Sequence, residues 1–265
     1  MTIKIENTPT SNDSLPTILY DDLFSLGTVS ASTEATDYPK ENAASEATTS
    51  YWQPTALPAW LEVDHSASTA NDCAAIIAHT LGTNGCTVTL QGSADNVSWS
   101  DVTSTTPTDD TTIFLLFTSV SYRYWRIYIT GSGSVPYIGR FMIGSRFNFP
   151  AGVVPPYNPV WLSQTYTLLT ATTLGGQFIG NRVLRQGGGT TINLVSLERD
   201  FAESNLLPFR EHYNLGKAFV WASGPAIFTK DVGYVWRKEG SIMAPTFDQN
   251  GSFMSVGMEV YAYGE

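Results

Sequence analysis

The sequence predicts a mainly β protein in two parts, the second of which contains one helix. Charged residues make up only 14% of the chain, against about 25% in a typical soluble domain. Thr, Ser, Gly and aromatic residues take their place, which is typical of β proteins with many turns. Residues 87–92 alternate apolar and polar side chains with a period of two, and Asn84-Gly85 just before them is a strong turn signal.

Length, charge and hydropathy limit the possible partners. A chain of 265 residues holds one large or two ordinary domains. The net charge is −10 and no basic run occurs, which argues against a nucleic-acid partner because phosphate binding needs clustered Lys and Arg. No apolar run reaches the roughly 18 residues of a membrane span, and residues 1–15 lack the apolar core of a signal peptide. We therefore expect no membrane insertion, and folding in a cytoplasm.

The first 50 residues are mostly polar. Residues 1–14 are rich in Thr, Asn and Ser, which predicts an arm that is either disordered or ordered only on a neighbouring subunit. Residues 15–29 contain short apolar pieces, and residues 30–50 form a polar stretch. A loop of this length inside a compact domain is often functional.

The first predicted domain covers residues 15–150 and is built of short strands. Its expected strands are residues 60–63, 74–78, 87–92, 113–120, 123–129 and 138–149, with a tight junction at Ser121-Tyr122. The Pro-rich segment 150–160 marks the boundary to the next domain.

The second predicted domain, residues 151–265, is β-rich with one helix. Its expected strands are residues 163–173, 177–185, 190–197, 218–221, 233–237 and 253–263, with a turn at Gly187-Gly188-Gly189. Residues 198–213 place Phe201, Leu206, Phe209 and Tyr213 near helical spacing. Pro208 must start a new turn or kink this helix.

Cysteines and histidines give no sign of a metal or cofactor site. Cys73 and Cys86 flank a strand and a turn and can face each other across a hairpin, but two buried thiols are favoured in a reducing compartment. The chain has no CxxC pair and its three histidines lie far apart, which argues against zinc. His79, beside a turn, is favoured as a hydrogen-bonded structural residue over a catalytic base.

Two further segments have a structural interpretation from their residues alone. Asp95-Asn96 tolerate the left-handed backbone of a tight hairpin, and Trp99 then folds back over the hairpin's apolar face. Arg123 and Arg126 point to opposite faces of one strand, and we expect one of them to pair with a carboxylate, with Asp64 as the candidate.

In their order, these motifs resemble the discoidin, or galactose-binding-like (coagulation-factor C-type), domain family over residues 51–147. The matching pieces are Trp52 in a loop, the strand Trp60-Leu61-Glu62-Val63-Asp64, the turn from Ser93 to Trp99, and Tyr122-Arg123-Tyr124-Trp125-Arg126. Asn96 stands where the family prefers Gly. The resemblance implies an eight-stranded jelly-roll β-sandwich.

Other pieces resemble versions of this domain in virion proteins of tailed phages. His79-Thr80-Leu81-Gly82 is similar to a turn of those versions, and residues 137–150 are similar to their transition into the next domain. The C-terminal half resembles the same proteins more diffusely.

A glycan-binding site is expected in and next to the long early loop. Lectin sandwiches use an aromatic platform with a few polar side chains on loops at one end, and the candidates here are Tyr38, Tyr51, Trp52, Asp37 and Asn42. The alternative is that Trp52 fills the bottom of the sandwich and the others are ordinary loop surface. In related domains this region can hold calcium through loop oxygens, for which Asp37 and Asn42 are suitable, but their spacing is not diagnostic.

The sequence thus predicts a non-enzymatic structural protein of a tailed-phage particle, in the tail tip, baseplate or neck. It would form a ring with copies of itself, contact other virion proteins and present the jelly roll as decoration or to host glycans. The alternative is a stand-alone carbohydrate-binding lectin, and a weaker third is a glycan-active enzyme. The chain has no G-x-S-x-G or H-E-x-x-H motif, and its glycine run lacks the Lys and Ser/Thr of a phosphate loop.

Overall fold

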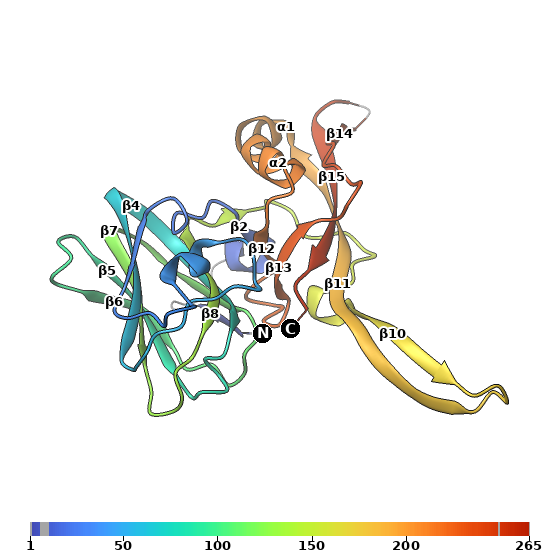
Figure 1. Cartoon of the computed structure of the whole chain (residues 1–265). Helices are drawn as coiled ribbons and strands as arrows, with labels where there is room; N and C mark the ends of the chain where they lie inside the picture. The colour runs from blue at the N-terminus through green and yellow to red at the C-terminus, as the bar shows by residue number, and fades with distance from the viewer. Residues whose placement is uncertain (1, 6–10, 249, 265) are drawn as a thin grey trace.

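Two β-sheets make up most of the protein, as the sequence predicts (Figure 1). The computed structural model describes residues 2–5, 11–248 and 250–264. The first sheet forms a jelly-roll sandwich, and the second sheet packs against one side of it. No helix in these described residues is long and apolar enough to cross a membrane.

The first sheet folds over on itself to give both layers of the jelly roll. Its strands are β1 (Thr2–Ile5), β3 (Thr28–Ala31), β4 (Ala59–His79), β5 (Thr87–Ser93), β6 (Ser100–Thr105), β7 (Ile113–Thr130) and β8 (Ile138–Gly144). The start of β4 pairs with β3 and its end with β8. The β4–β7 register shifts between Asp64 and Thr69, and Ser66 adopts a φ of 64° at this bend. The predicted strands 113–120 and 123–129 are therefore one bent strand that passes through both layers.

Residues on β4 alternate between two separate cores. Ala74 and Ile76 face the jelly-roll core, while Cys73, Ala75 and Ile77 face the second sheet. This segment is buried on both faces, which explains its unbroken apolar sequence. The same alternation occurs on the facing strand β12 (Phe219–Ala222), where Val220 and Ala222 contact the jelly roll.

The second sheet is covered by a helix on its other face. Its strands are β2 (Thr17–Leu19), β9 (Phe147–Asn148), β10 (Gln164–Thr172), β11 (Phe178–Glu198), β12, β13 (Val232–Arg237), β14 (Thr246–Phe247) and β15 (Phe253–Ala262). The predicted helix consists of α1 (Arg199–Phe201), a π-helical segment (Ala202–Leu206) and α2 (Leu207–Asn214). Pro208 lies in the first turn of α2, where its missing N–H costs no hydrogen bond. Short 3-10 helices occur at Ser11–Ser14, Lys40–Ala44 and Val160–Leu162.

The glycine run Gly187-Gly188-Gly189 lies inside β11 and is not the predicted turn. Glycine is needed there by close packing: a Cβ on Gly189 would lie 2.9 Å from the Val260 carbonyl oxygen, and one on Gly188 would lie 3.0 Å from Ser163 Oγ. β11 therefore continues through the run, pairing first with β10 and then with β15. The turn between β10 and β11 falls at residues 173–177, where Thr173 N–H donates to Gln177 O at 2.8 Å.

The N-terminal residues join the body of their own chain. Thr2–Ile5 pairs in parallel with Ile113–Leu116, which differs from the expected arm on a neighbouring subunit; residues 1 and 6–10 of that arm lie outside the described residues. Thr17–Leu19 pairs with β12 and β9 of the second sheet. The predicted jelly-roll segment 15–150 thus begins and ends with strands that belong to the other sheet.

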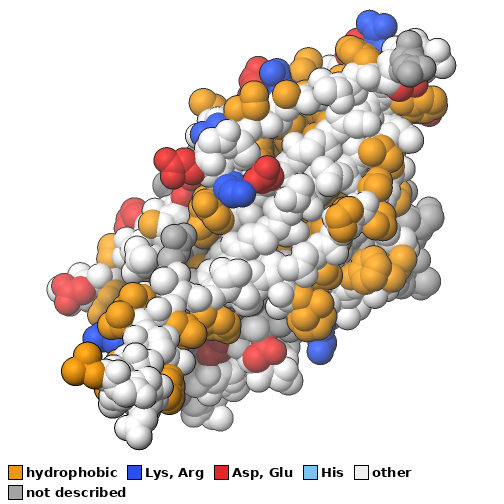
Figure 2. Space-filling model, turned by 90° about the vertical axis from the view of Figure 1, so that its right-hand side faces the viewer, with side chains coloured by type: hydrophobic (Ala, Val, Ile, Leu, Met, Phe, Trp, Pro, Cys, Tyr) orange, Lys and Arg blue, Asp and Glu red, His pale blue; other side chains and the backbone are white. Residues whose placement is uncertain are grey.

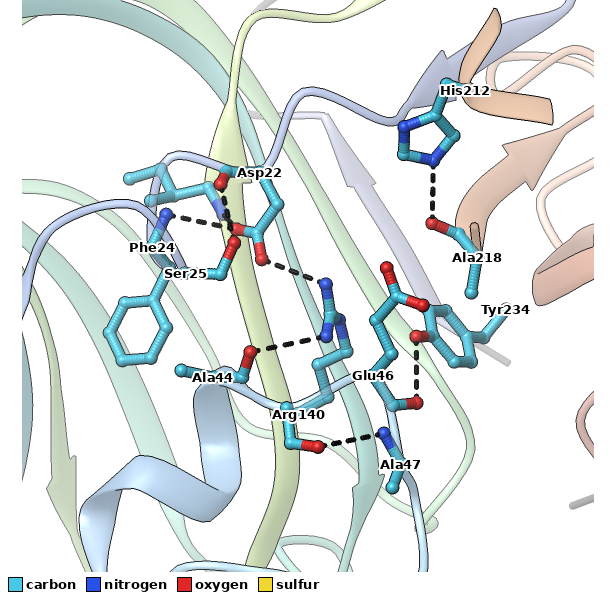
Figure 3. A network of polar contacts seen from close by, with 12 residues as sticks. Asp22, Phe24, Ser25, Ala44, Glu46, Ala47, Arg140, His212, Ala218 and Tyr234 are labelled. Atoms are coloured by element: carbon cyan, nitrogen blue, oxygen red, sulfur yellow. Dashed lines mark hydrogen bonds and ion pairs between the residues drawn. The ribbon is translucent and has the colours of Figure 1, made fainter. Parts of the chain in front are cut away.

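A buried ion pair ties the early loop to the junction of the two sheets (Figure 3). Arg140 Nη2 lies 3.0 Å from Asp22 Oδ2, and the two side chains are 3% and 5% exposed. Asp22 Oδ1 also accepts the N–H groups of Phe24 and Ile143. Burial raises the pKa of Asp22 to about 6, although the Arg140 charge lowers it. The Arg140 guanidinium also lies 5.7 Å from the ring centre of Tyr234 on β13, so the pair contacts both sheets.

Both cysteines are free, buried thiols, as the sequence favours. Cys73 belongs to the cluster between the two sheets, and Cys86 belongs to the jelly-roll core. They therefore do not face each other across a hairpin.

His79 is a structural histidine that is neutral at pH 7. Its Nδ1 accepts the Leu81 N–H at 3.2 Å, so its Nε2 carries the proton that it donates to Thr111 O at 2.9 Å. Burial lowers the pKa of His79 to about 4, outweighing the Thr111 hydrogen bond and the charges of Asp110 and Asp109, which raise it. Protonation of Nδ1 would also remove the acceptor of the Leu81 N–H.

This histidine is expected to make the protein less stable in mild acid. The unfolded chain takes up a proton at His79 near pH 6.5, whereas the folded protein does so only near pH 4. The free energy of unfolding should therefore fall as the pH drops from 6.5 to 4, by up to about 3 kcal/mol from this residue. Urea unfolding at several pH values should show a shallower slope in His79→Gln; parallel curves for the two proteins would contradict the assignment.

Candidate functional site

Three half-buried tyrosines form a stack beside the early loop. The ring centres of Tyr38 and Tyr51 lie 4.5 Å apart with their planes 11° from parallel, and those of Tyr51 and Tyr137 also lie 4.5 Å apart, at 32°. Tyr51 is therefore the middle ring, and its two faces are covered by its neighbours. The outer faces of Tyr38 and Tyr137 remain directed away from the stack.

Backbone pairing beneath the rings holds the stack in place. Trp52 and Ile138 exchange two backbone hydrogen bonds, at 2.8 and 2.9 Å, and both side chains point into the jelly-roll core. Because neighbouring residues of an extended chain point to opposite sides, Tyr51 and Tyr137 point outward. A backbone hydrogen bond, from the Gln53 N–H to Tyr38 O at 3.3 Å, holds Tyr38 beside this segment and so beside Tyr51.

Trp52 is a core residue and offers no surface to a ligand. Its side chain is 0% exposed, and its Nε1–H donates to Thr33 O at 3.0 Å. The structure thus supports the alternative in which Trp52 fills the sandwich, and corrects its placement among the ligand-binding residues. Its role at the site is to anchor the segment that carries Tyr51.

Asn42 and Asp37 take different positions beside the stack. Asn42 Nδ2 donates to Tyr51 O at 3.0 Å, so that side chain supports the middle tyrosine from behind. Asp37 is exposed next to Tyr38. Among the described residues, no three His, Cys, Asp or Glu side chains gather as they would around a metal ion.

The middle phenol of the stack, Tyr51, is uncharged at neutral pH. A hydrogen bond with the Tyr38 hydroxyl raises the pKa of Tyr51. The loop before Asn42 is further fixed by Lys40, whose backbone N–H donates to Glu34 Oε2 at 3.0 Å and whose ammonium lies 3.0 Å from Glu41 Oε1. The stack is therefore an aromatic surface on a fixed loop.

Tyr137 also lines a small cavity at the junction of the two sheets. The cavity has a volume of about 230 Å³, and its lining residues are Ala78, His79, Asp110, Thr111, Tyr137, Tyr263 and Gly264. Asp110 is its carboxylate, and both oxygens already accept hydrogen bonds from Thr83. A carboxylate has about four lone-pair sites, so Asp110 can accept further hydroxyl groups.

Sequence reasoning missed Tyr137 as a site residue. The signal that points to it is local: Tyr51-Trp52 and Tyr137-Ile138 are each a half-exposed tyrosine followed by a buried apolar residue at the edge of the sandwich. What the sequence does not reveal is that the two pairs are joined by the Trp52–Ile138 bridge.

The other motif residues stabilise the jelly roll at a distance from the stack. Arg123 forms two hydrogen bonds of 2.8 Å with Asp64, as predicted. The Arg126 guanidinium lies 3.9 Å from the centre of the Trp99 ring. Asn96 has the expected left-handed backbone, with φ of 60°. These contacts account for the motif residues without a ligand.

A wider groove borders the small cavity and shares Tyr263 and Gly264 with it. It has a volume of about 880 Å³ and lies on β10, β11, β13 and β15, where the second sheet extends past the jelly roll. Trp236 and Tyr261 line it, with ring centres 6.5 Å apart, and so does the Lys238–Glu259 ion pair, at 2.7 Å. Aromatic side chains therefore continue from the tyrosine stack to the second sheet.

Comparison with known proteins finds similarity over about half of this chain. Chitosan-binding module 1 of a chitosanase/glucanase from Paenibacillus sp. IK-5 is 20% identical, with a TM-score of 0.42, over 46% of this chain and 97% of the module. CpGH89CBM32-5 from Clostridium perfringens, in complex with GalNAc-β-1,3-galactose, is 13% identical, with a TM-score of 0.41, over 47% of this chain and 99% of the other. CBM32 of AlyQ in complex with 4,5-unsaturated mannuronic acid is 19% identical, with a TM-score of 0.40, over 47% of this chain and 95% of the other. No curated protein matches the chain. Residues 28–142 match the family model of the F5/8 type C domain.

Proposed function

We propose that this protein binds carbohydrate at the tyrosine stack. The observation that carries the proposal is Tyr137, which belongs to the stack and also lines the cavity that contains the Asp110 carboxylate. The C–H face of a sugar ring packs on an aromatic ring, and its hydroxyl groups donate to carboxylates nearby; such a combination of apolar wall and few polar groups is typical of ligand sites. The cavity is small, which suits one sugar ring inside it.

Charge around the site favours a neutral sugar or an amino sugar. Asp110 lines the cavity, Asp37 is exposed beside the stack, and the whole chain has a net charge of −10. A uronic acid would bring its carboxylate toward these like charges, which is unfavourable. The adjoining groove with Trp236 and Tyr261 favours an oligosaccharide over a single sugar, because further rings can be placed along it.

Binding should depend on the two outer tyrosines. We expect Tyr137→Ala and Tyr38→Ala each to lower the affinity for a bound oligosaccharide by about tenfold, since an aromatic contact contributes about 0.5–1.5 kcal/mol beyond its buried area and 1.4 kcal/mol is tenfold. A glycan array that includes neutral, amino and uronic oligosaccharides would find the ligand, and calorimetry would compare the variants. Tyr124→Ala is the matched control, because Tyr124 is a half-buried tyrosine outside the stack. Equal affinity in all four proteins would contradict the site, and no binding across the array would contradict the function.

The second candidate function is a structural role in a tailed-phage particle, with a ring of copies assembled in the host cytoplasm. It rests on the sequence resemblance, and none of the solved structures compared above is a virion protein. The structural observation that favours an assembly role is the projecting β10–β11 hairpin. An antibody to this chain, used to probe purified phage particles, would test this role. Absence of the chain from the particles would count against it.

A further inference from the structure

The β10–β11 hairpin projects from the body of the protein (Figure 1). Within the part of the chain that the structure describes, β10 pairs only with β11, over Gln164–Thr172, and β11 turns to its second partner, β15, from Gly188 onward. The outer part of the hairpin is thus a two-stranded ribbon at the edge of the second sheet. Such a ribbon is marginally stable in water by itself, and its edge strand leaves backbone groups available for pairing.

Hydrophobic side chains are exposed on both faces of this ribbon. Each of the pairs Leu168-Leu169, Phe178-Ile179 and Val183-Leu184 sends one side chain to each face, because neighbouring residues in a strand point in opposite directions. Their exposures run from 48% to 66%. Leu174, in the turn at the tip, is fully exposed. Figure 2 views the side of the molecule from which the hairpin projects, and hydrophobic side chains are spread over it, with acidic and basic side chains among them.

The exposed apolar area is what a protein–protein contact requires. Eight large apolar residues between 164 and 184 are exposed: the six that form the three pairs, together with Leu174 and Tyr166. At about 60–120 Å² for a fully exposed side chain, they present roughly 300–600 Å². A stable interface buries about 800 Å² per partner, of which somewhat more than half, or about 450 Å², is apolar. An apolar patch of this size is as large as the largest patch of a typical monomer, and such patches are often functional.

Charge indicates which partner covers the hairpin. Residues 164–188 contain two arginines and no Asp or Glu. The rest of the chain has the remaining 12 of the 14 basic residues and all 24 acidic ones, a net charge of −12. The body of a second copy is therefore electrostatically complementary to the hairpin, whereas a hairpin packed on another hairpin would bring like charges together.

We propose that the β10–β11 hairpin packs on the body of a second copy of this chain and is the contact through which the protein self-associates. Each copy then has a hairpin to donate and a body of net negative charge to accept one. Such a contact is satisfied in a two-fold dimer that exchanges hairpins or, when the acceptor is always the next copy, in a closed ring. The proposal does not depend on carbohydrate binding.

The test is the mass of the purified full chain in solution, by light scattering and sedimentation. We expect the wild type to have a mass that is a multiple of the 28.9 kDa of one copy. Replacing Leu169, Phe178, Ile179 and Leu184 by Thr, which retains strand propensity, should reduce the mass to that of one copy. A second variant replaces residues 169–182 by Asn-Gly, which joins the paired residues Leu168 and Val183 in a tight turn; it should also be monomeric.

A matched control removes exposed apolar residues outside the hairpin. Leu26, Val97, Leu215 and Ile227 are 60–80% exposed, and replacing all four by Thr should leave the oligomer intact. Arg182→Glu in the full hairpin should weaken association, since it reverses a charge directed at an acidic partner. A wild type that is monomeric, or hairpin variants that keep the wild-type mass with unchanged thermal unfolding, would overturn the proposal.

Discussion

Replacing Arg140 by Met is expected to lower the free energy of unfolding by about 3–5 kcal/mol. The substitution leaves the buried Asp22 carboxylate without its cation. Arg140 also donates to Ala44 O at 3.5 Å and lies over Tyr234 of the second sheet, so the loss affects the loop and the junction together (Figure 3). Urea unfolding at pH 7 measures the effect.

A double variant separates the lost charge pair from lost packing. Asp22→Asn with Arg140→Met removes both charges, and because buried ion pairs contribute little against neutral groups of similar size, the double variant should be more stable than Arg140→Met alone. The interpretation would be wrong if Arg140→Met unfolded within about 1 kcal/mol of the wild type, which is the range of an exposed pair. Arg123→Met, which breaks the half-exposed pair with Asp64, should stay within that range.

Trp52→Ala is the second large effect, with an expected loss of about 3–5 kcal/mol. The side chain is fully buried among the residues of the jelly-roll core, and its removal leaves a cavity and an unpaired Thr33 carbonyl. Since Trp52 lies beneath Tyr51 and contacts no ligand, any loss of carbohydrate binding should follow the fraction of unfolded protein. Thermal unfolding followed with and without an oligosaccharide separates the two effects.

Trp99→Ala is the matched control for that variant. Trp99 is half exposed beside Arg126 on the surface of the jelly roll, so the same substitution removes less buried area and should cost clearly less. Trp52→Phe, which retains a ring in the core, should fall between the two. If Trp52→Ala bound no sugar while unfolding like the wild type, Trp52 would belong to the binding surface after all.

The sequence predicted those parts of the fold that depend on local patterns. Strands with one solvent-exposed face, such as β5 and β15, follow from the alternation of apolar and polar side chains with a period of two. The Arg123–Asp64 pair follows from the motif. The bend that makes β4 and β7 single strands could not be predicted, because the register shift at Asp64 depends on pairing with residues about 60 positions away. The parallel pairing of Thr2–Ile5 with β7 spans more than 100 residues and has the same limitation.

Some of the predicted site residues lie together, whereas others do not, and their role in binding stays a prediction. Tyr38, Tyr51 and Asn42 meet as expected, because they lie on one loop. Trp52 and Tyr51 are neighbours with opposite environments, and only the bridge to Ile138 decides which of them faces the core. Tyr137 and Tyr263 come from distant segments, so their contribution depends on the packing of the second sheet against the first.

The double burial of β4 bears on how such a protein can evolve. A module that moves between genes needs a polar outer surface so that it remains soluble beside any new neighbour. Here Ala75, Ile77 and Met142 on the outer side of the jelly roll are covered by the second sheet, and strands from both ends of the predicted first segment are part of that sheet. Recombination at the Pro-rich connector would expose an apolar layer, so the two halves are expected to be inherited together as one unit of selection.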